Sequence, residues 1–324
     1  MGIFDFLFGG KRKQPEVTTR TAPSNDECKA VIRSGFLTID DIDFFGPCAT
    51  SPSGEWIIAC VEGAFDGSKL GRYVLYNAHE HKVYLQGNME RPNSGHVADN
   101  GTFSLEDWLF SGNLNGIFYV IEKSGETVIS RKFDANILNS AISPNGALAV
   151  CQTANSDTVC GNILAGFDLQ SKSELFTVHP STGWADKYEF GEDNETVTVV
   201  LDKIGKFRYD RAGTFLDEKR YESARLKSKK YDVALMTAEE ILKREQLDKK
   251  TVETVLSAIE NARKQGADER SDWKALALKL QGIAFENLGR DAEALEAYQG
   301  ALELDPKIGV KRRAAALQKQ QNKP

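Results

Sequence analysis

The side chains best able to bind a metal ion or to act as nucleophiles are four histidines and five cysteines. His79 and His81 lie two residues apart, so both could point to the same side of a strand as metal ligands. No third ligand follows at a spacing usual for a metal site. We therefore interpret this pair as part of an exposed turn between two strands.

Four of the cysteines fall within apolar segments typical of strands, where thiols usually pack as small hydrophobic groups. Cys48 and Cys60 are separated by 11 residues, and Cys151 and Cys160 by 8. Zinc sites need closer pairs than these, so we expect buried core thiols. The cysteines are also too sparse for a disulfide framework, which favours a reducing compartment and a cytoplasmic location.

Other reactive patterns are equally weak. The acidic run at residues 40–43 lacks the glycine and the final glutamate of a calcium loop. The sequence has no phosphate-binding loop, nucleophile elbow or kinase signature. We therefore predict no catalytic residue, no metal site and no cofactor, and a protein that is not an enzyme.

Charge is unevenly distributed along the 324 residues, a length that suits two domains. From Asp217 onward there are 22 basic and 19 acidic residues, whereas the preceding part has 19 basic and 28 acidic residues. The larger, acidic part repels phosphate backbones, so nucleic acid is not an expected partner. No apolar run reaches the 18 residues of a membrane-spanning helix.

Residues 1–13 form an amphipathic segment that ends in a basic cluster. Apolar side chains beside basic ones suit weak contact with the inner leaflet of a membrane. Docking of the same aromatic residues on a protein surface is the alternative. Residues 14–34 are polar and are predicted to be a flexible linker. The predicted membrane-contact residues are Ile3, Phe4, Phe6, Leu7, Phe8, Lys11, Arg12 and Lys13.

Residues 35–216 are predicted to form an all-β domain. Short apolar runs, among them 56–62, 71–78, 116–123, 147–153, 163–169 and 196–202, alternate with Gly, Asn, Asp and Ser turns. A turn-like tetrapeptide recurs before a strand at 51–54, 98–101, 143–146 and 191–194. The last residues of these turns lie 47, 45 and 48 positions apart.

A repeat of this length with about four strands is typical of propeller blades. Each unit also carries an Asn or Asp followed by a tight polar turn, as at Asn77 and Asp168. The region resembles the WD-repeat and related bacterial propeller families, although no unit contains their Trp-Asp or Gly-His pairs. The resemblance implies a propeller-like domain of about four blades. A closed small ring, an open ring completed by dimerisation or by residues 35–46, and a β-sandwich stay open as alternatives.

Residues 217–324 change to a helical pattern rich in Ala, Leu, Lys and Glu. Asp248 and Asp291 are expected N-caps, and Pro306 is expected in a first helical turn. The predicted helices span 218–228, 231–244, 249–264, 271–288, 291–304 and 307–320.

Residues 275–306 resemble a tetratricopeptide repeat, with small and aromatic residues at its helix-packing positions. Leu278 and Gln281 stand near the first-helix positions usually held by Trp and Leu, so one departs from the pattern. The matching residues are Gly282, Phe285, Ala294, Tyr298, Ala301 and Pro306.

Such repeats bind peptides on the face formed by their first helices, which here implies Leu276, Lys279, Ile283 and Glu286. The leading functional hypothesis is a non-catalytic scaffold or adaptor with a propeller-like platform and a short tetratricopeptide module. Self-association as a homodimer is the alternative role of the helices. An enzyme with its active site in the propeller funnel and a peripheral membrane adaptor are alternative functions.

Overall fold

The computed structural model describes residues 18–21, 28–64, 66–110 and 114–321. It divides the chain into two compact units, which are described separately here. The first contains the sequence up to Val200 together with Phe207–Leu216. The second contains Leu201–Lys206 and everything from Asp217 onward.

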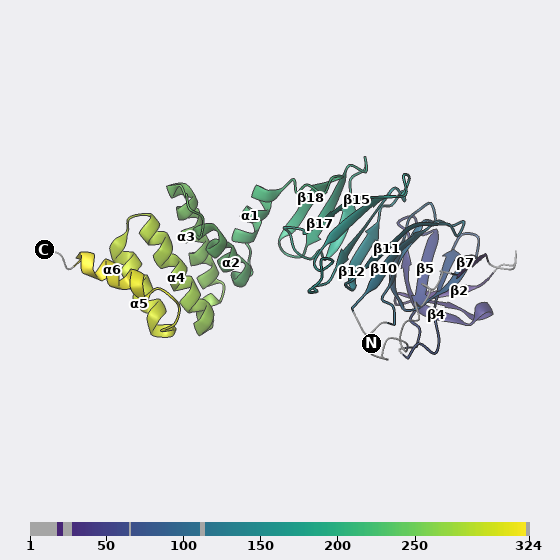
Figure 1. The fold of residues 1–324 in the computed structure, drawn as a ribbon, viewed down its shortest axis with the longest axis horizontal. Helices are drawn as coiled ribbons and strands as arrows, with labels where there is room; N and C mark the ends of the chain where they lie inside the picture. The colour runs from purple at the N-terminus through teal and green to yellow at the C-terminus, as the bar shows by residue number, and fades with distance from the viewer. Residues whose placement is uncertain (1–17, 22–27, 65, 111–113, 322–324) are drawn as a thin grey trace, which may run out of the picture. The chain divides into compact units, whose positions relative to one another are not determined.

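Four antiparallel sheets follow one another along the chain in the first unit (Figure 1). The blade-like part of the first sheet is β4 (Phe44–Thr50), β5 (Trp56–Val61), β6 (Gly71–Asn77) and β7 (Lys82–Met89). The second is β8 (Pro92–Val97), β9 (Phe103–Asp107), β10 (Gly116–Ile121) and β11 (Thr127–Phe133). The third is β12 (Ile137–Ile142), β13 (Leu148–Thr153), β14 (Leu164–Asp168) and β15 (Ser173–Val178). The fourth has only β16 (Lys187–Phe190), β17 (Thr196–Leu201) and β18 (Gly205–Asp210).

The predicted fold class, an all-β propeller-like domain followed by an all-α domain, is confirmed. All six apolar runs predicted as strands coincide with strands of these sheets. The expectation of four strands per unit is wrong for the last unit, whose described sheet has three. In the view of Figure 1 the sheets appear in chain order, with the first and the fourth at opposite ends of the β-unit.

Three further strands extend the first sheet. β1 (Thr18–Thr21) pairs with β7, and β2 (Ala30–Arg33) pairs with β3 (Phe36–Ile39), which pairs with β4. Two of these strands lie inside the stretch 14–34 that was predicted to be a flexible linker. That prediction is wrong for them, because sheet edges offer backbone partners even to polar sequences.

The recurring turns are confirmed, and they have one conformation. Gly54, Gly101, Gly146 and Asn194 all have positive φ, between 58° and 83°. Each donates its backbone N–H to the carbonyl three residues earlier, at 2.9–3.0 Å. This is the left-handed position that glycine, and less often asparagine, adopts at low cost.

Successive turns also contact one another. The backbone N–H of Ser53 donates to Asp99 Oδ1 at 2.8 Å, and the N–H of Asp99 donates to the carbonyl of Pro144 at 2.8 Å. Asn145 Nδ2 then donates to Asn194 Oδ1 at 3.2 Å. These contacts between successive turns therefore hold neighbouring sheets together at the end where the first strand of each sheet meets the second.

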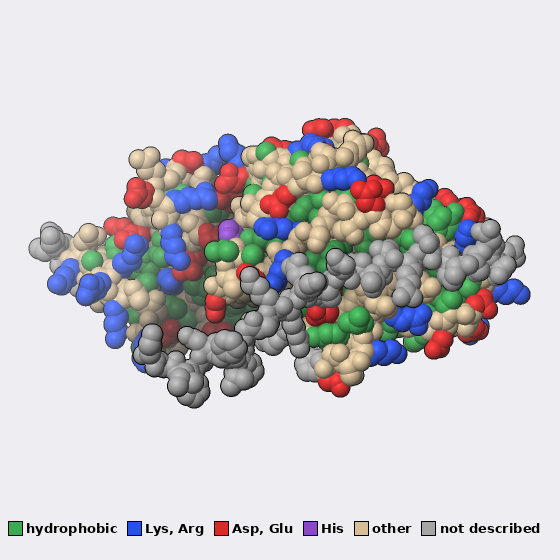
Figure 2. Space-filling view, turned by 45° about the vertical axis from the view of Figure 1, so that its right-hand side comes forward, with side chains coloured by type: hydrophobic (Ala, Val, Ile, Leu, Met, Phe, Trp, Pro, Cys, Tyr) green, Lys and Arg blue, Asp and Glu red, His purple; other side chains and the backbone are tan. Residues whose placement is uncertain are grey.

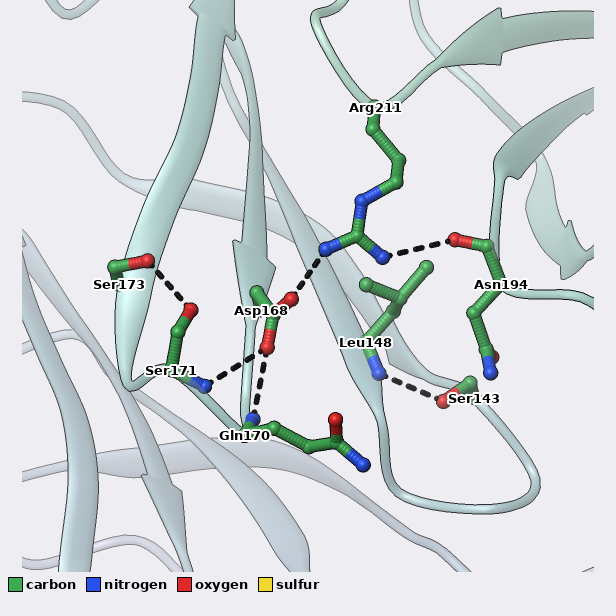
Figure 3. A network of polar contacts seen from close by, with 8 residues as sticks. All are labelled: Ser143, Leu148, Asp168, Gln170, Ser171, Ser173, Asn194 and Arg211. Carbon is green, nitrogen blue, oxygen red and sulfur yellow. Dashed lines mark hydrogen bonds and ion pairs between the residues drawn. The ribbon is translucent and has the colours of Figure 1, made fainter.

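The second repeated feature, Asn77 and Asp168, closes the turn after the third strand of its sheet. Asp168 Oδ1 accepts from the backbone N–H groups of Gln170 and Ser171, at 2.9 and 3.0 Å (Figure 3). Asn77 Oδ1 accepts from two backbone N–H groups in the same way. Arg211 donates to Asp168 Oδ2 and to the carbonyl of Asn194, joining the third and fourth sheets.

Apolar side chains fill the spaces between sheets. One cluster lies between the first and second sheets and includes Ile58, Tyr73 and Leu105. Another lies between the second and third and includes Phe118 and Phe167, whose rings are 5.5 Å apart.

Six helices form the second unit, close to the predicted bounds. Asp248 caps its helix as predicted, accepting from Thr251 N at 2.8 Å. Asp291 is the first residue of its helix rather than the N-cap. The helices are α1 (Glu218–Leu226), α2 (Tyr231–Leu242), α3 (Lys249–Lys264), α4 (Ser271–Asn287), α5 (Asp291–Leu304) and α6 (Lys311–Gln321).

The prediction that the last helix begins at 307, with Pro306 in its first turn, is wrong. Gly309 has φ of 90°, a conformation that a right-handed helix cannot contain, so α6 begins only at Lys311. Pro306 instead follows the end of α5.

Gly282 allows α4 and α5 to pack closely. A Cβ atom at this position would lie 2.3 Å from the ring of Tyr298, which is fully buried. The small-and-aromatic pairing expected for 275–306 is therefore present between these helices.

Candidate functional site

The first strands of the four sheets together line a groove of about 650 Å³. β8 lies against β4 and β12, and β12 lies against β16. The repeat explains this arrangement, because each recurring turn directly follows the first strand of its sheet. The residues that line the groove include Asn93, Ser94, His96, Glu106, Leu138, Asn139, Ser140, Asp186, Lys187, Tyr188 and Glu189.

A smaller pocket of about 160 Å³ adjoins the groove between β4 and β8. Both hollows share Ala49, Asn93, Ser94 and His96 in their walls. Cys60, a buried thiol, lines the smaller pocket, and burial raises its pKa to about 12. It is therefore a neutral core thiol, as predicted.

Among the carboxyl groups of the groove wall, Glu106 of β9 has a pKa that is clearly shifted from its ordinary value. Its side chain accepts from Ser140 Oγ at 2.7 Å and is also hydrogen-bonded by Asn93. Only 1% of Glu106 is exposed, and this burial raises its pKa to about 7 in spite of the two hydrogen bonds. The group therefore changes charge near neutral pH.

His96 lies on the same face of the second sheet as Glu106. The pairs Ser94–Glu106 and His96–Ser104 are adjacent in the β8–β9 ladder, which places all four on one face. Burial lowers the pKa of His96, so its ring is neutral at pH 7. Within the described residues neither the His96 ring nor Ser104 Oγ has a hydrogen-bond partner.

A hydrogen-bond network joins the third and fourth sheets beside the groove. Tyr188 OH donates to Asn139 Oδ1 at 2.8 Å and to Gln152 Oε1 at 3.0 Å. Gln152, which is buried, also bonds the carbonyl of Gly183 and the N–H of Ala185. The short loop before β16 is thus held on both sides of residue 184.

Trp184 stands in that loop and is 50% exposed. Its indole N–H donates to Asn162 Oδ1 at 3.0 Å. The backbone on both sides of Trp184 is hydrogen-bonded to the buried Gln152 side chain, and the ring itself to Asn162, so these contacts restrict the position of this exposed ring. It lies two residues before Asp186, which lines the groove.

The predicted peptide-binding residues lie on α4, where the structure gives two of them partners within the helical unit. Lys279 Nζ donates to Glu239 Oε1 at 3.0 Å, and Glu286 accepts from Tyr298 OH at 2.6 Å and from Arg313 Nη1 at 3.0 Å. Leu276 and Ile283 are partly buried beside the helical core. Their role in peptide binding stays a prediction.

Other predicted sites are placed as follows. His79 and His81 lie in the tight turn between β6 and β7, and Cys151 is buried in β13. The predicted membrane-contact residues, from Ile3 to Lys13, lie outside the described residues. Across the described ranges no three His, Cys, Asp or Glu side chains are grouped to hold a metal ion.

The surface drawn in Figure 2 carries acidic and basic side chains interspersed over most of its area.

In the part of the chain that the structure describes, no helix is long and apolar enough to cross a membrane.

The groove residues were not identified from the sequence. The first strands are short and partly polar, as in PNSGHV and KYEF, so they lack the apolar runs that revealed the other strands. Their position before each recurring turn was the available signal.

No protein family model matches the sequence, and no curated protein is similar to it. Among solved structures, dihydro-heme d1 dehydrogenase NirN in complex with DHE is 15% identical with a TM-score of 0.37, over 59% of this chain and 43% of that one. The β-propeller domain of Cps50 (Swd1) from Myceliophteria thermophila is 10% identical with a TM-score of 0.35, over 57% of this chain and 61% of that one. The chain thus spans about half the length of these proteins, and the fold described above rests on its own sheet topology.

Proposed function

We propose that this protein is a non-catalytic interaction protein whose β-domain binds a segment of a partner protein in the groove. The observation that carries the proposal is the groove itself. It is open, it is lined by four strands of one compact unit, and its wall combines apolar side chains with amides, hydroxyls and charged groups. Such a wall suits an extended peptide, which presents both side chains and backbone groups.

Trp184 supports the same function. Half-exposed tryptophans are frequent anchors of protein interfaces because one ring buries much area on binding. Here the ring is already held by Asn162 and its flanking backbone by Gln152. Little conformational freedom is left to lose when a partner covers it.

The helical unit supplies a second surface in this proposal. The close approach of Tyr298 to Gly282 supports a tetratricopeptide-like hairpin of α4 and α5. The hairpin would present Leu276 and Ile283 to a partner, with Lys279 and Glu286 fixing the helices that surround them. Self-association through this face is the competing role.

An enzyme active in the groove is the second candidate, and one observation favours it. A carboxyl with a pKa near 7, such as that of Glu106, is suited to proton transfer at neutral pH. Binding is the better-supported function because the side-chain partners of this carboxyl, Ser140 and Asn93, are not proton-transfer groups, so they do not form an acid–base pair with it.

Affinity purification with the full chain tests the proposal. Trp184→Ala removes the anchor, which stands two residues before the groove-lining Asp186 and is not itself part of the groove wall, whereas Val159→Ala removes another apolar side chain outside the wall, one that is 89% exposed. We expect recovery of bound proteins to fall about tenfold or more for Trp184→Ala and to be unchanged for Val159→Ala. Equal recovery from both variants and the unaltered protein would refute the proposed function of the β-domain.

A further inference from the structure

Glu106 is a buried acid whose pKa is affected by no basic side chain among the described residues. The titratable groups that interact electrostatically with Glu106 are Cys60 on β5, Cys151 on β13 and Tyr188 on β16. His96 lies on the same face of β8 as Ser94, the residue that pairs with Glu106. At neutral pH all four are uncharged, because burial lowers the pKa of His96 and raises the pKa of the other three.

Lys187 is the basic residue that lines the groove, and acidic residues lie close to it. Lys187 Nζ is 3.9 Å from Glu189 Oε1; the lysine side chain is largely exposed and the glutamate side chain is partly exposed. Asp186 also lines the groove. With Glu106 ionised, the wall contains a buried negative charge, which favours a positive ligand at that end of the groove.

A buried carboxylate is costly unless a cation or several donors accompany it. Ser140 and Asn93 supply neutral donors, and with these alone the carboxyl is only about half ionised at pH 7. A ligand that brings a positive charge would supply the cation that this carboxylate lacks.

His96 gives a second, independent indication of a ligand. Its ring lines both the groove and the adjoining pocket and has no hydrogen-bond partner among the described residues. A neutral imidazole offers one acceptor nitrogen. The two acceptors, Glu106 and His96, lie on one face of the β8–β9 ladder.

We infer that the Glu106 end of the groove binds the guanidinium group of an arginine side chain in the partner segment. A guanidinium carries a fixed charge and five N–H donors in one plane, so it can meet a carboxylate and a nearby acceptor together. An ammonium offers a more strongly hydrated point charge, which fits a partly buried acceptor pair less well. This inference rests on the proposed function and names the chemistry of the partner.

The test uses two small probes with the full-length protein. N-acetyl-arginine methylamide carries the guanidinium, and N-acetyl-citrulline methylamide has nearly the same shape without the charge. Binding is followed by NMR, from the ¹³C signal of the Glu106 carboxyl and the ring signals of His96. We expect the arginine probe to bind at least about tenfold more tightly, which corresponds to about 1.4 kcal/mol.

Binding of the probe is thermodynamically linked to ionisation of Glu106, so the pKa of this carboxyl can be measured with and without the probe in the unaltered protein. A probe that binds the ionised carboxyl about tenfold better than the neutral one lowers the pKa of Glu106 by about one unit at saturation. An unchanged Glu106 titration, or equal binding of the two probes, would overturn the inference.

Two variants locate the effect. Glu106→Gln keeps an oxygen for Ser140 but removes the charge, and should weaken the arginine probe about tenfold or more. Glu189→Gln removes a charge from the groove rim and should change binding less than about threefold. Equal losses in both variants would show a general acidic field and would overturn the assignment to Glu106. A negative result here would refute arginine binding at Glu106 but would not change the outcome of the Trp184→Ala experiment. The inference and the proposed function can therefore be refuted independently.

Discussion

Replacing Glu106 by Gln should change how the stability of the β-domain depends on pH. Burial raises the pKa of this carboxyl from the ordinary 4.5 to about 7, so the folded state holds the proton more tightly than the unfolded state. The resulting stabilisation is complete below pH 4.5 and is lost as the pH rises to about 7. A glutamine has no such dependence.

The size of the effect follows from the two pKa values. A difference of about 2.5 units corresponds to about 3 kcal/mol, since each unit is worth about 1.4 kcal/mol. Relative to the unaltered protein, Glu106→Gln should therefore gain up to about 3 kcal/mol in the free energy of unfolding between pH 4 and pH 8. The side chain is 1% exposed, so solvent screens little of this difference.

Urea unfolding followed by tryptophan fluorescence measures this difference. Three of the four tryptophans, Trp56, Trp108 and Trp184, lie in the first unit, so a Trp273→Phe background reports that unit alone. The exposed Glu192, replaced by Gln, serves as the control and should show a flat difference. A flat difference for Glu106→Gln as well, within about 0.5 kcal/mol, would refute the burial argument.

Three further substitutions test the packing of the two units. Gly282→Ala should destabilise the helical unit by about 1–3 kcal/mol, because the new Cβ would lie 2.3 Å from the Tyr298 ring; a neutral result in urea unfolding would argue against the tight hairpin. Gly146→Ala should cost the β-domain about 1–2 kcal/mol, since φ is 68° and the Cβ would lie 2.5 Å from the Asn100 amide; unchanged thermal unfolding would contradict this turn geometry. Asp248→Ala should cost about 1 kcal/mol by removing an N-cap, and equal helix content and midpoint by circular dichroism would show that the cap is not formed in solution.

The elements predicted from the sequence are those whose local chemistry admits one conformation. Each recurring turn requires a residue with positive φ, which glycine or asparagine supplies at low cost, and these residues made the period of the repeat visible in the sequence. The helical bounds were close because the breaks at 246–248, 266–268 and 289–290 interrupt strong periodic patterns. The start of α6 was missed because Pro306 and Gly309 compete, and the left-handed glycine prevails.

The candidate site could not be predicted because it depends on contacts between sheets. Glu106 follows Leu105 in a short strand and looks like an ordinary solvent-facing acid. It is buried only because β12 brings Ser140 onto it from a different sheet. Trp184 likewise gains its fixed position from Gln152, more than 30 residues away. Pairings between sheets of this kind leave no periodic signal in a single sequence.

The central claim, that partner proteins lie in the groove, is tested most directly by site-specific photocrosslinking. A photoreactive residue at Leu138, which is 39% exposed in the groove wall, is compared with one at Leu70, which is 44% exposed and does not line the groove. We predict discrete crosslinked polypeptides from position 138 that disappear in the Trp184→Ala variant, and only background from position 70. Crosslinks of equal yield and pattern at both positions, unaffected by Trp184→Ala, would contradict the claim.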